Sequence, residues 1–309
     1  MKGRVGLAFK ITISVALIAF LAWKYGGDDS FRAVLGRLDW RYFLAADAVI
    51  IFGLALSALR WVVLLGAAGV KLPFLRSMRL YFEGYFFNFF LPTTVGGDVA
   101  RGMGVRHDVP LAIIGGSILM ERLLGFGCLL ALGLTASFQN ESMAIARGAL
   151  GFAALVYVTG LLVLIFAPLP RPTGTEWWAK GANALRKLAD QVRGYGFRPG
   201  ALLAGLVLSL GWQLSLVAAN GLLSQGLGGV APWTGLLALI PVVQAVTMIP
   251  VSFGGLGVRE MGYEYFFRVS GYDPAGAVAL GVAWLALTAL VSLKGGAVLL
   301  GSSLGKRRN

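Results

Sequence analysis

The strongest constraint on the fold of this 309-residue chain is a series of long apolar runs. A helix needs about 20 mainly apolar residues to cross a bilayer. Runs of this length lie at 5–23, 42–65, 111–137, 148–167, 201–223 and 275–300. Only 13% of the residues are charged, whereas a soluble domain has about 25%. The sequence therefore predicts an all-α integral membrane protein with about six transmembrane helices.

Composition also limits the chemistry. The net charge is +13, but the basic residues are scattered between apolar runs. This pattern indicates contact with anionic lipid headgroups rather than with nucleic acid. The only cysteine is Cys128 and the only histidine is His107, which excludes an intramolecular disulfide and disfavours a His/Cys metal site. No phosphate-binding P-loop motif is present. We expect no cofactor, no metal and no catalytic residue, and therefore no enzyme.

Basic residues predict the topology, because Lys and Arg favour the cytoplasmic side. They cluster near both termini, at 71–79 and in 170–199, which reads as an amphipathic helix on the cytoplasmic surface. All of these basic segments can lie on the cytoplasmic side only if 74–106 and 230–270 are re-entrant hairpins. The first hairpin then enters the membrane from the cytoplasmic face and the second from the opposite face. Two complete spans at 74–92 and 232–251 are the alternative, which leaves the basic loops on inconsistent sides. The segment 233–251 is also expected to be broken by Pro241 and Pro250.

One irregular phrase occurs twice, as "PTTVGGDVAR" at 92–101 and as "PVSFGGLGVR" at 250–259. With the two hairpins, it predicts an inverted repeat whose halves are 41–137 and 200–303, within a single membrane domain at 1–309. Such repeats are common in transporters. The alternative is chance similarity, since 44 of the 309 residues are glycine.

The repeated phrase has the chemistry of a phosphate site. Proline ends a helix, the two glycines permit a tight turn, and a new helix then presents free N–H groups. A hydroxyl and a guanidinium add donors for a phosphate. The candidate substrate-binding residues are Thr94, Gly96, Gly97 and Arg101, together with Ser252, Gly254, Gly255 and Arg259.

Further charged residues lie within apolar segments, where an ionisable side chain is a functional candidate. The candidates for counter-charge or coupling are Arg79, Glu83, Glu121, Arg122, Glu260 and Glu264. Arg79 and Glu83 are one helical turn apart and are expected to pair. Structural ion pairs between helices, or long side chains that extend to the membrane interface, are the alternatives for these residues. The aromatic runs "YFFNFF" and "YEYFF" are expected to serve packing.

The segments "SALRWVVLLGAAGV", "YFFNFFLPTTVGGDVARGMGV", "ILMERLLGFGCLLAL" and "IPVSFGGLGVREMG" resemble the lysylphosphatidylglycerol synthase transmembrane-region family, also called flippase-like domain proteins. The resemblance covers about 5–300. It implies translocation of a polar lipid, such as an anionic phospholipid, a polyprenyl phosphate or a hopanoid-type lipid. It also implies a multi-pass protein of the cytoplasmic (inner) membrane, with both termini cytoplasmic. The aminoacyl-transferase domain of the synthases is missing from the sequence, so synthase activity is not expected.

Two other functions stay open at this stage. A membrane-embedded lipid-modifying enzyme would need an acid/base or nucleophile pair within the bilayer. A non-transporting scaffold for lipid or glycan synthesis would tolerate replacement of both phrase arginines, Arg101 and Arg259.

Overall fold

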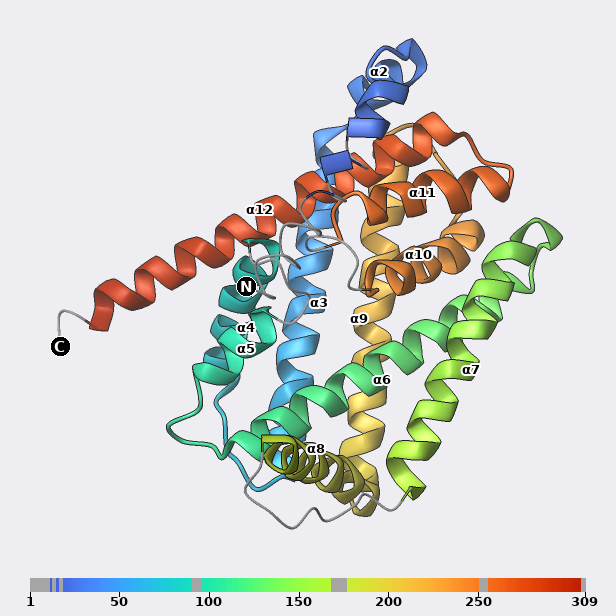
Figure 1. Ribbon diagram of the computed structural model, residues 1–309. Coiled ribbons are helices and arrows are strands. Elements are labelled where there is room, and N and C mark those ends of the chain that lie inside the picture. The colour runs from blue at the N-terminus through green and yellow to red at the C-terminus, as the bar shows by residue number, and fades with distance from the viewer. Residues whose placement is uncertain are drawn as a thin grey trace.

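The computed structural model describes residues 19–90, 96–167, 177–249 and 255–306, with positions 12, 15 and 16. Every regular element in these ranges is a helix (Figure 1). Five helices are long and apolar enough to cross a membrane, namely α3 (Trp40–Ala67), α6 (Leu111–Ser137), α7 (Ala144–Phe166), α9 (Pro199–Gly226) and α12 (Pro274–Lys306). They confirm an all-α integral membrane protein. The remaining predicted span, 5–23, lies largely outside the described residues.

Helices α3 and α9 form an antiparallel pair at the centre of the molecule (Figure 1). At one end, the amide of Asp39 donates to the carbonyl of Gly226 at 3.0 Å. At the other end, the hydroxyl of Tyr195 donates to the carbonyl of Leu64, also at 3.0 Å. Gly53 lets the two helices approach, because a Cβ there would lie 2.8 Å from the Cβ of Ser215. This pair provides the frame on which the shorter helices are placed.

Two helical hairpins pack against this frame. The first contains α4 (Phe74–Phe90) and α5 (Gly96–Met103), and the second contains α10 (Trp233–Thr247) and α11 (Val258–Val269). Helix α4 packs on α12, and α10 packs on α6. The order of a long helix, two short helices and a long helix thus occurs twice. The predicted entry of the hairpins from opposite membrane faces, and the inverted relation of the halves, stay predictions.

Pro241 does not break the second hairpin, contrary to the expectation from sequence. Helix α10 continues through Pro241 and ends at Thr247. A Cβ on Gly133 of α6 would lie 2.6 Å from the Cβ of Pro241, so the glycine makes room for the proline ring. Tight packing between α6 and α10 therefore compensates for the backbone hydrogen bond that proline removes. Pro250 lies outside the described residues.

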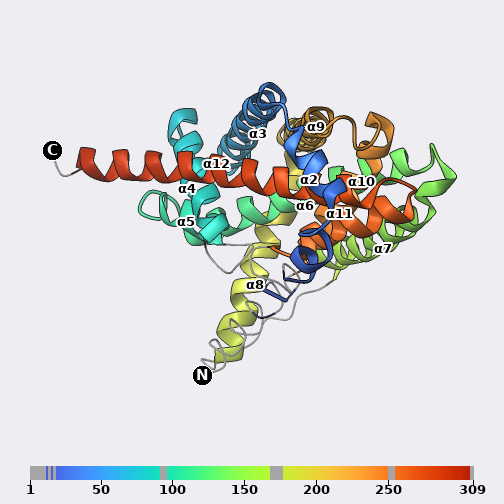
Figure 2. The same cartoon turned by 90° about the horizontal axis from the view of Figure 1, so that it is seen from above.

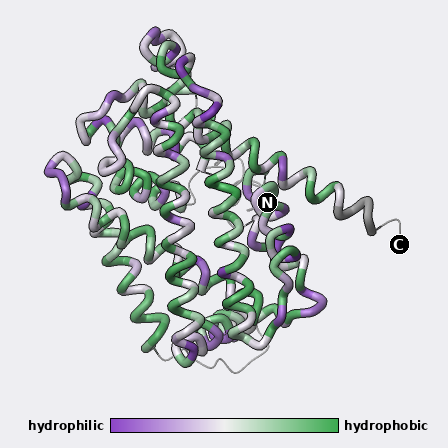
Figure 3. The backbone as a smooth tube through the Cα atoms, turned by 180° about the vertical axis from the view of Figure 1, so that it is seen from behind, coloured by the Kyte–Doolittle hydropathy of each residue, from purple (hydrophilic) through white to green (hydrophobic). Residues whose placement is uncertain are grey.

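The remaining helices lie at the periphery. Helix α8 (Trp177–Gly194) runs roughly perpendicular to α3 and α9, as Figures 1 and 2 show together. Arg193 fixes it to the end of α7 by donating to the carbonyls of Leu164 (2.9 Å) and Ala167 (2.6 Å). The short helix α2 (Asp29–Gly36) lies at the opposite end of the bundle (Figure 1). Hydrophilic positions gather in the connections at the two ends, whereas the long helices are mainly hydrophobic (Figure 3).

Candidate functional site

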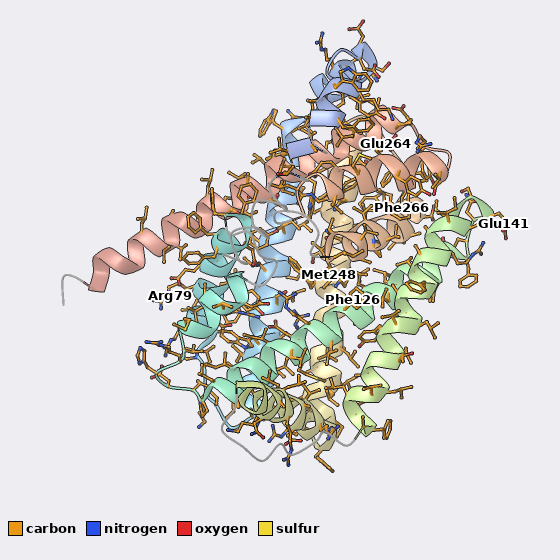
Figure 4. All side chains as sticks on the ribbon, in the orientation of Figure 1. Arg79, Phe126, Glu141, Met248, Glu264 and Phe266 are labelled. Carbon is orange, nitrogen blue, oxygen red and sulfur yellow. The ribbon has the colours of Figure 1, made fainter. Side chains whose placement is uncertain are left out.

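A cavity of about 390 Å³ lies where the two hairpins face the long helices. It has an unusual number of charged groups for the interior of a membrane protein. The charged side chains that line it are Arg60, Asp98, Arg101, Glu121, Arg122 and Arg259. Phe126 of α6 and Met248, which follows α10, also border it and are labelled in Figure 4. With four arginines and two carboxylates, the lining carries an excess of two positive charges.

The carboxylate of Glu121 is the centre of a buried network on the side of the first hairpin. Arg60 of α3 donates to it from Nε at 3.2 Å and from Nη2 at 3.0 Å. Arg101 of α5 forms an ion pair with it at 2.7 Å, and the hydroxyl of Tyr81 of α4 also donates to it. Arg60 reaches α9 as well, through a 2.8 Å hydrogen bond to Ser209. The network therefore ties five helices together.

Arg101 is buried and contacts both aromatic rings and carboxylates. It is 4% exposed, and its guanidinium lies 4.6 Å from the ring centre of Trp61 and 4.3 Å from that of Tyr81. Such stacking over aromatic rings stabilises a cation. Its Nη2 also donates to Asp98 at 2.9 Å. Asp98 in turn accepts from Nε of Arg122 at 2.6 Å. Arg101 is thus part of the cavity wall.

Arg259, in the second hairpin, has fewer ionic partners than Arg101 has in the first. Arg259 donates to one oxygen of the neighbouring Glu260, from Nε at 3.1 Å and from Nη2 at 2.9 Å. The other oxygen of Glu260 accepts from the amide of Gly257 at 2.7 Å, at the start of α11. Arg259 borders the central cavity and two recesses that adjoin it, of about 230 and 200 Å³. The partner of Arg259 is therefore the adjacent residue Glu260, and the Arg259 side chain borders open space.

The matching glycines of the two phrases have different roles. A Cβ on Gly97 would lie 2.1 Å from the carbonyl oxygen of Gly84, so Gly97 allows α5 to lie directly on α4. Its amide donates to Oδ1 of Asn88 at 2.7 Å and already has an acceptor. Gly255 has a φ of +81°, in the region that favours glycine, and a Cβ there would meet nothing closer than 3.6 Å. One glycine is needed for space and the other for backbone conformation.

Several residues expected from the sequence do meet in one place. The central cavity is lined by Gly97, Arg101, Glu121, Arg122 and Arg259, and an adjoining recess by Gly255. Gly96 is buried, and Glu260 is buried beside Arg259. Thr94, Ser252 and Gly254 lie outside the described residues.

Other expected residues lie elsewhere. Arg79 and Glu83 form the predicted pair at 3.5 Å, but they do not line the cavity, and Arg79 lies at the outer edge of α4 (Figure 4). Glu264 accepts from Lys24 at 2.9 Å and from Arg268 at 3.1 Å, on the upper side of α11 in Figure 4. These groups serve as ion pairs between or along helices.

Sequence reasoning missed several polar residues of the cavity, among them Arg60, Tyr81, Asn88 and Gln244. Arg60 had a usable signal, because it lies deep in an apolar span of 28 residues and is only 7% exposed. The others are uncharged and sit in the aromatic or apolar parts of the hairpins, where nothing in the sequence distinguishes them. In the part of the chain that the structure describes, no three His, Cys, Asp or Glu side chains gather as a metal site requires.

Fold and cavity together define a multi-pass α-helical membrane protein with a charged cavity in its core. The chain matches the family model described as "Lysylphosphatidylglycerol synthase TM region" over residues 7–295. It therefore belongs to that family, which is membrane-associated and linked to lipid-related function. Neither curated proteins nor solved structures gave a match.

Proposed function

We propose that this protein moves a polar, phosphate-containing lipid between the two leaflets of the cytoplasmic (inner) membrane. The observation that carries the proposal is the cavity of about 390 Å³, lined by four arginines, between helices long enough to span the membrane. Charged side chains are costly at membrane depth and mark substrate pathways when they face a cavity. Membership of a lipid-linked family supports the same function.

The arrangement of the hairpins supports alternating access. Both hairpins border the same cavity, through Gly97 and Arg101 on one side and Arg259 on the other. We propose that they are re-entrant, that they enter from opposite faces and that both termini are cytoplasmic. A headgroup bound between them is then reachable from either leaflet by small movements of one half against the other, as in inverted-repeat transporters. The driving force in this scheme is a gradient or mass action, and no step of chemistry is required.

Lipid scrambling in proteoliposomes tests the proposal. Headgroup-labelled lipids and a membrane-impermeant quencher report how fast lipid leaves the inner leaflet. We expect faster loss of protected fluorescence with the protein than in empty liposomes, and a rate at least about tenfold lower for Arg259→Ala, since it loses a charged hydrogen-bonding group. The matched control is Arg268→Ala, which lies on the same helix but outside the cavity lining.

The outcomes separate this proposal from the alternatives. No acceleration for anionic phospholipid, polyprenyl phosphate or hopanoid-type lipid would refute translocation. Conversion of the labelled lipid to a new species, seen by chromatography, would instead indicate a lipid-modifying enzyme. Acceleration that survives Arg259→Ala would show that the lipid takes another route.

A further inference from the structure

The recess of about 230 Å³ that adjoins the central cavity brings the two halves of the chain together. Arg122 reaches it from α6 in the first half, and Arg259 from α11 in the second. Asn88 of α4 and Gln244 of α10 also line it. These four residues border the central cavity as well, so the recess is continuous with it. The sequence indicated one phosphate site in each half, whereas in the structure arginines from both halves line one recess.

We propose that the two halves share one anion site, in which Arg122 and Arg259 bind the phosphate of a lipid with a small, uncharged headgroup. Lipids with a cationic, aminoacylated headgroup are excluded from it. This inference rests on the proposed function and names its substrate class.

The donors fit a phosphate. A guanidinium presents several N–H groups in a plane that matches two phosphate oxygens at once. Two guanidinium groups from different helices therefore serve several oxygens of one phosphodiester. The carboxamides of Asn88 and Gln244 add neutral N–H donors for the remaining oxygens and for headgroup hydroxyls.

Carboxylate oxygens of the protein already accept hydrogen bonds from both guanidinium groups, as phosphate oxygens would. Asp98 accepts from Nε of Arg122 at 2.6 Å, and Glu260 accepts from Nε and Nη2 of Arg259. Both guanidinium groups are thus oriented and charged before any substrate arrives. A phosphate that enters the recess shares them with these carboxylates, which limits affinity and favours release, as transport requires.

Among the described residues that line the cavity, an ammonium group finds no comparable partner. Asp98 is engaged by Arg101 and Arg122, and Glu121 is engaged by Arg60 and Arg101. These are the two carboxylates that line the cavity, and each is already paired with two arginines. A cationic headgroup would face an excess of positive charge, which disfavours its entry.

The volume of the cavity suits a lipid headgroup. Sites for small molecules usually measure about 300–1,000 Å³. A cavity of about 390 Å³ therefore holds a headgroup and leaves the acyl chains in the membrane. A compact headgroup such as phosphoglycerol fits within this volume, and charge rather than size excludes the aminoacylated headgroup.

Equilibrium binding to the full chain in phosphatidylcholine nanodiscs tests the inference by isothermal titration calorimetry. The probes are dihexanoyl phosphatidylglycerol, its lysyl ester, dihexanoyl phosphatidylcholine and inorganic phosphate. We expect phosphatidylglycerol to bind at least about tenfold more tightly than the other three. Arg122→Ala and Arg259→Ala should each weaken that binding about tenfold or more. Arg122→Gln, which keeps hydrogen-bond donors, and Arg268→Ala serve as comparisons; the first should weaken binding less than Arg122→Ala and the second should not change it.

Each contrary result has a distinct meaning. Equal or tighter binding of the lysyl ester would overturn the exclusion of cationic headgroups. Inorganic phosphate binding as tightly as the lipid would show a site for the free ion. Phosphatidylglycerol affinity unchanged in both alanine variants would overturn the shared site. Tight, arginine-dependent binding without scrambling would preserve the site and refute translocation instead.

Discussion

Arg101 and Arg259 hold the same place in two similar ten-residue phrases, yet their surroundings differ. Arg101 lies between two aromatic rings and is paired with Asp98 and Glu121, from two helices. Arg259 is paired with its own neighbour, Glu260, and borders three connected spaces. The first arginine holds helices together, whereas the second is presented to the cavity.

The difference shows that matching residues in two similar segments can have different roles, one structural and one in binding. A charge that is buried and paired with two carboxylates stabilises one arrangement of helices and is a poor ligand, because binding would have to break strong interactions. A charge with a single local partner can exchange that partner for a substrate. We infer that the first hairpin supplies the wall of the site and the second supplies a ligand, with Arg122 as the ligand from the first half.

The largest effect should follow from neutralising the carboxylate of Glu121, which Arg60 and Arg101 share. Glu121→Gln leaves Arg60 buried without its counter-charge and leaves Arg101 with Asp98 alone, and breaking such a buried pair costs about 3–5 kcal/mol. We expect a clear fall in the midpoint of thermal unfolding in detergent. Glu141→Gln is the control, because Glu141 pairs with Arg147 at 3.3 Å but is 95% exposed, and such pairs contribute about 0–1 kcal/mol. Equal midpoints for the two variants would refute the buried network.

An intermediate effect should distinguish the two glycines. Gly97→Ala places a Cβ 2.1 Å from the carbonyl oxygen of Gly84, and overpacking of this kind costs about 1–3 kcal/mol. Gly255→Ala meets no close atom, but its φ of +81° costs about 1–2 kcal/mol for an L side chain.

Asparagine separates these two causes, because it tolerates a positive φ better than alanine and is larger. We expect Gly255→Asn to unfold at a higher temperature than Gly255→Ala, and Gly97→Asn to unfold at a lower temperature than Gly97→Ala. Gly148→Ala, where a Cβ would meet nothing within 4 Å, is the control. The same order at both positions would contradict the distinction between space and conformation.

The smallest effect concerns the carboxylate that competes for Arg122. Asp98→Asn removes a charge that binds both Arg101 and Arg122. We expect dihexanoyl phosphatidylglycerol to bind a few-fold more tightly, about 0.5–1 kcal/mol, because the phosphate no longer shares Arg122. Calorimetry on the wild type and the variant measures this change. Weaker binding in Asp98→Asn would show that Asp98 orients Arg122 for the ligand rather than competing with it.

Much of the fold followed from apolar length alone. The five described spans agree with the predicted runs to within about four residues at most ends, which is normal for helix boundaries. The exception is the span that contains α7, which begins at Glu141 rather than at 148 because the short helix Glu141–Met143 precedes α7. Pro241 was misjudged because its neighbour on another helix, Gly133, decides whether the ring fits.

The site was predictable only where charge marked it. Arg101, Glu121, Arg122 and Arg259 stand out as charges in apolar or glycine-rich sequence, and all four line the cavity. Asn88 could not be identified in this way, since its role depends on lying beside the amide of Gly97 after the first hairpin closes. The different roles of the two phrases also depend on neighbours from distant helices, which the phrases themselves do not encode.

The most direct test of transport through the cavity is a reversible block at its wall. Thr288 lines the cavity, and its hydroxyl donates to the carbonyl of Leu285 in its own helix, so Thr288→Cys in a Cys128→Ser background should fold and transport normally. Reaction of that cysteine with a bulky methanethiosulfonate should stop lipid scrambling, and dithiothreitol should restore it. The same reagent on Ser142→Cys, at an exposed position outside the cavity lining, should have no effect. Scrambling at the original rate after complete labelling of Thr288→Cys would contradict a route through this cavity.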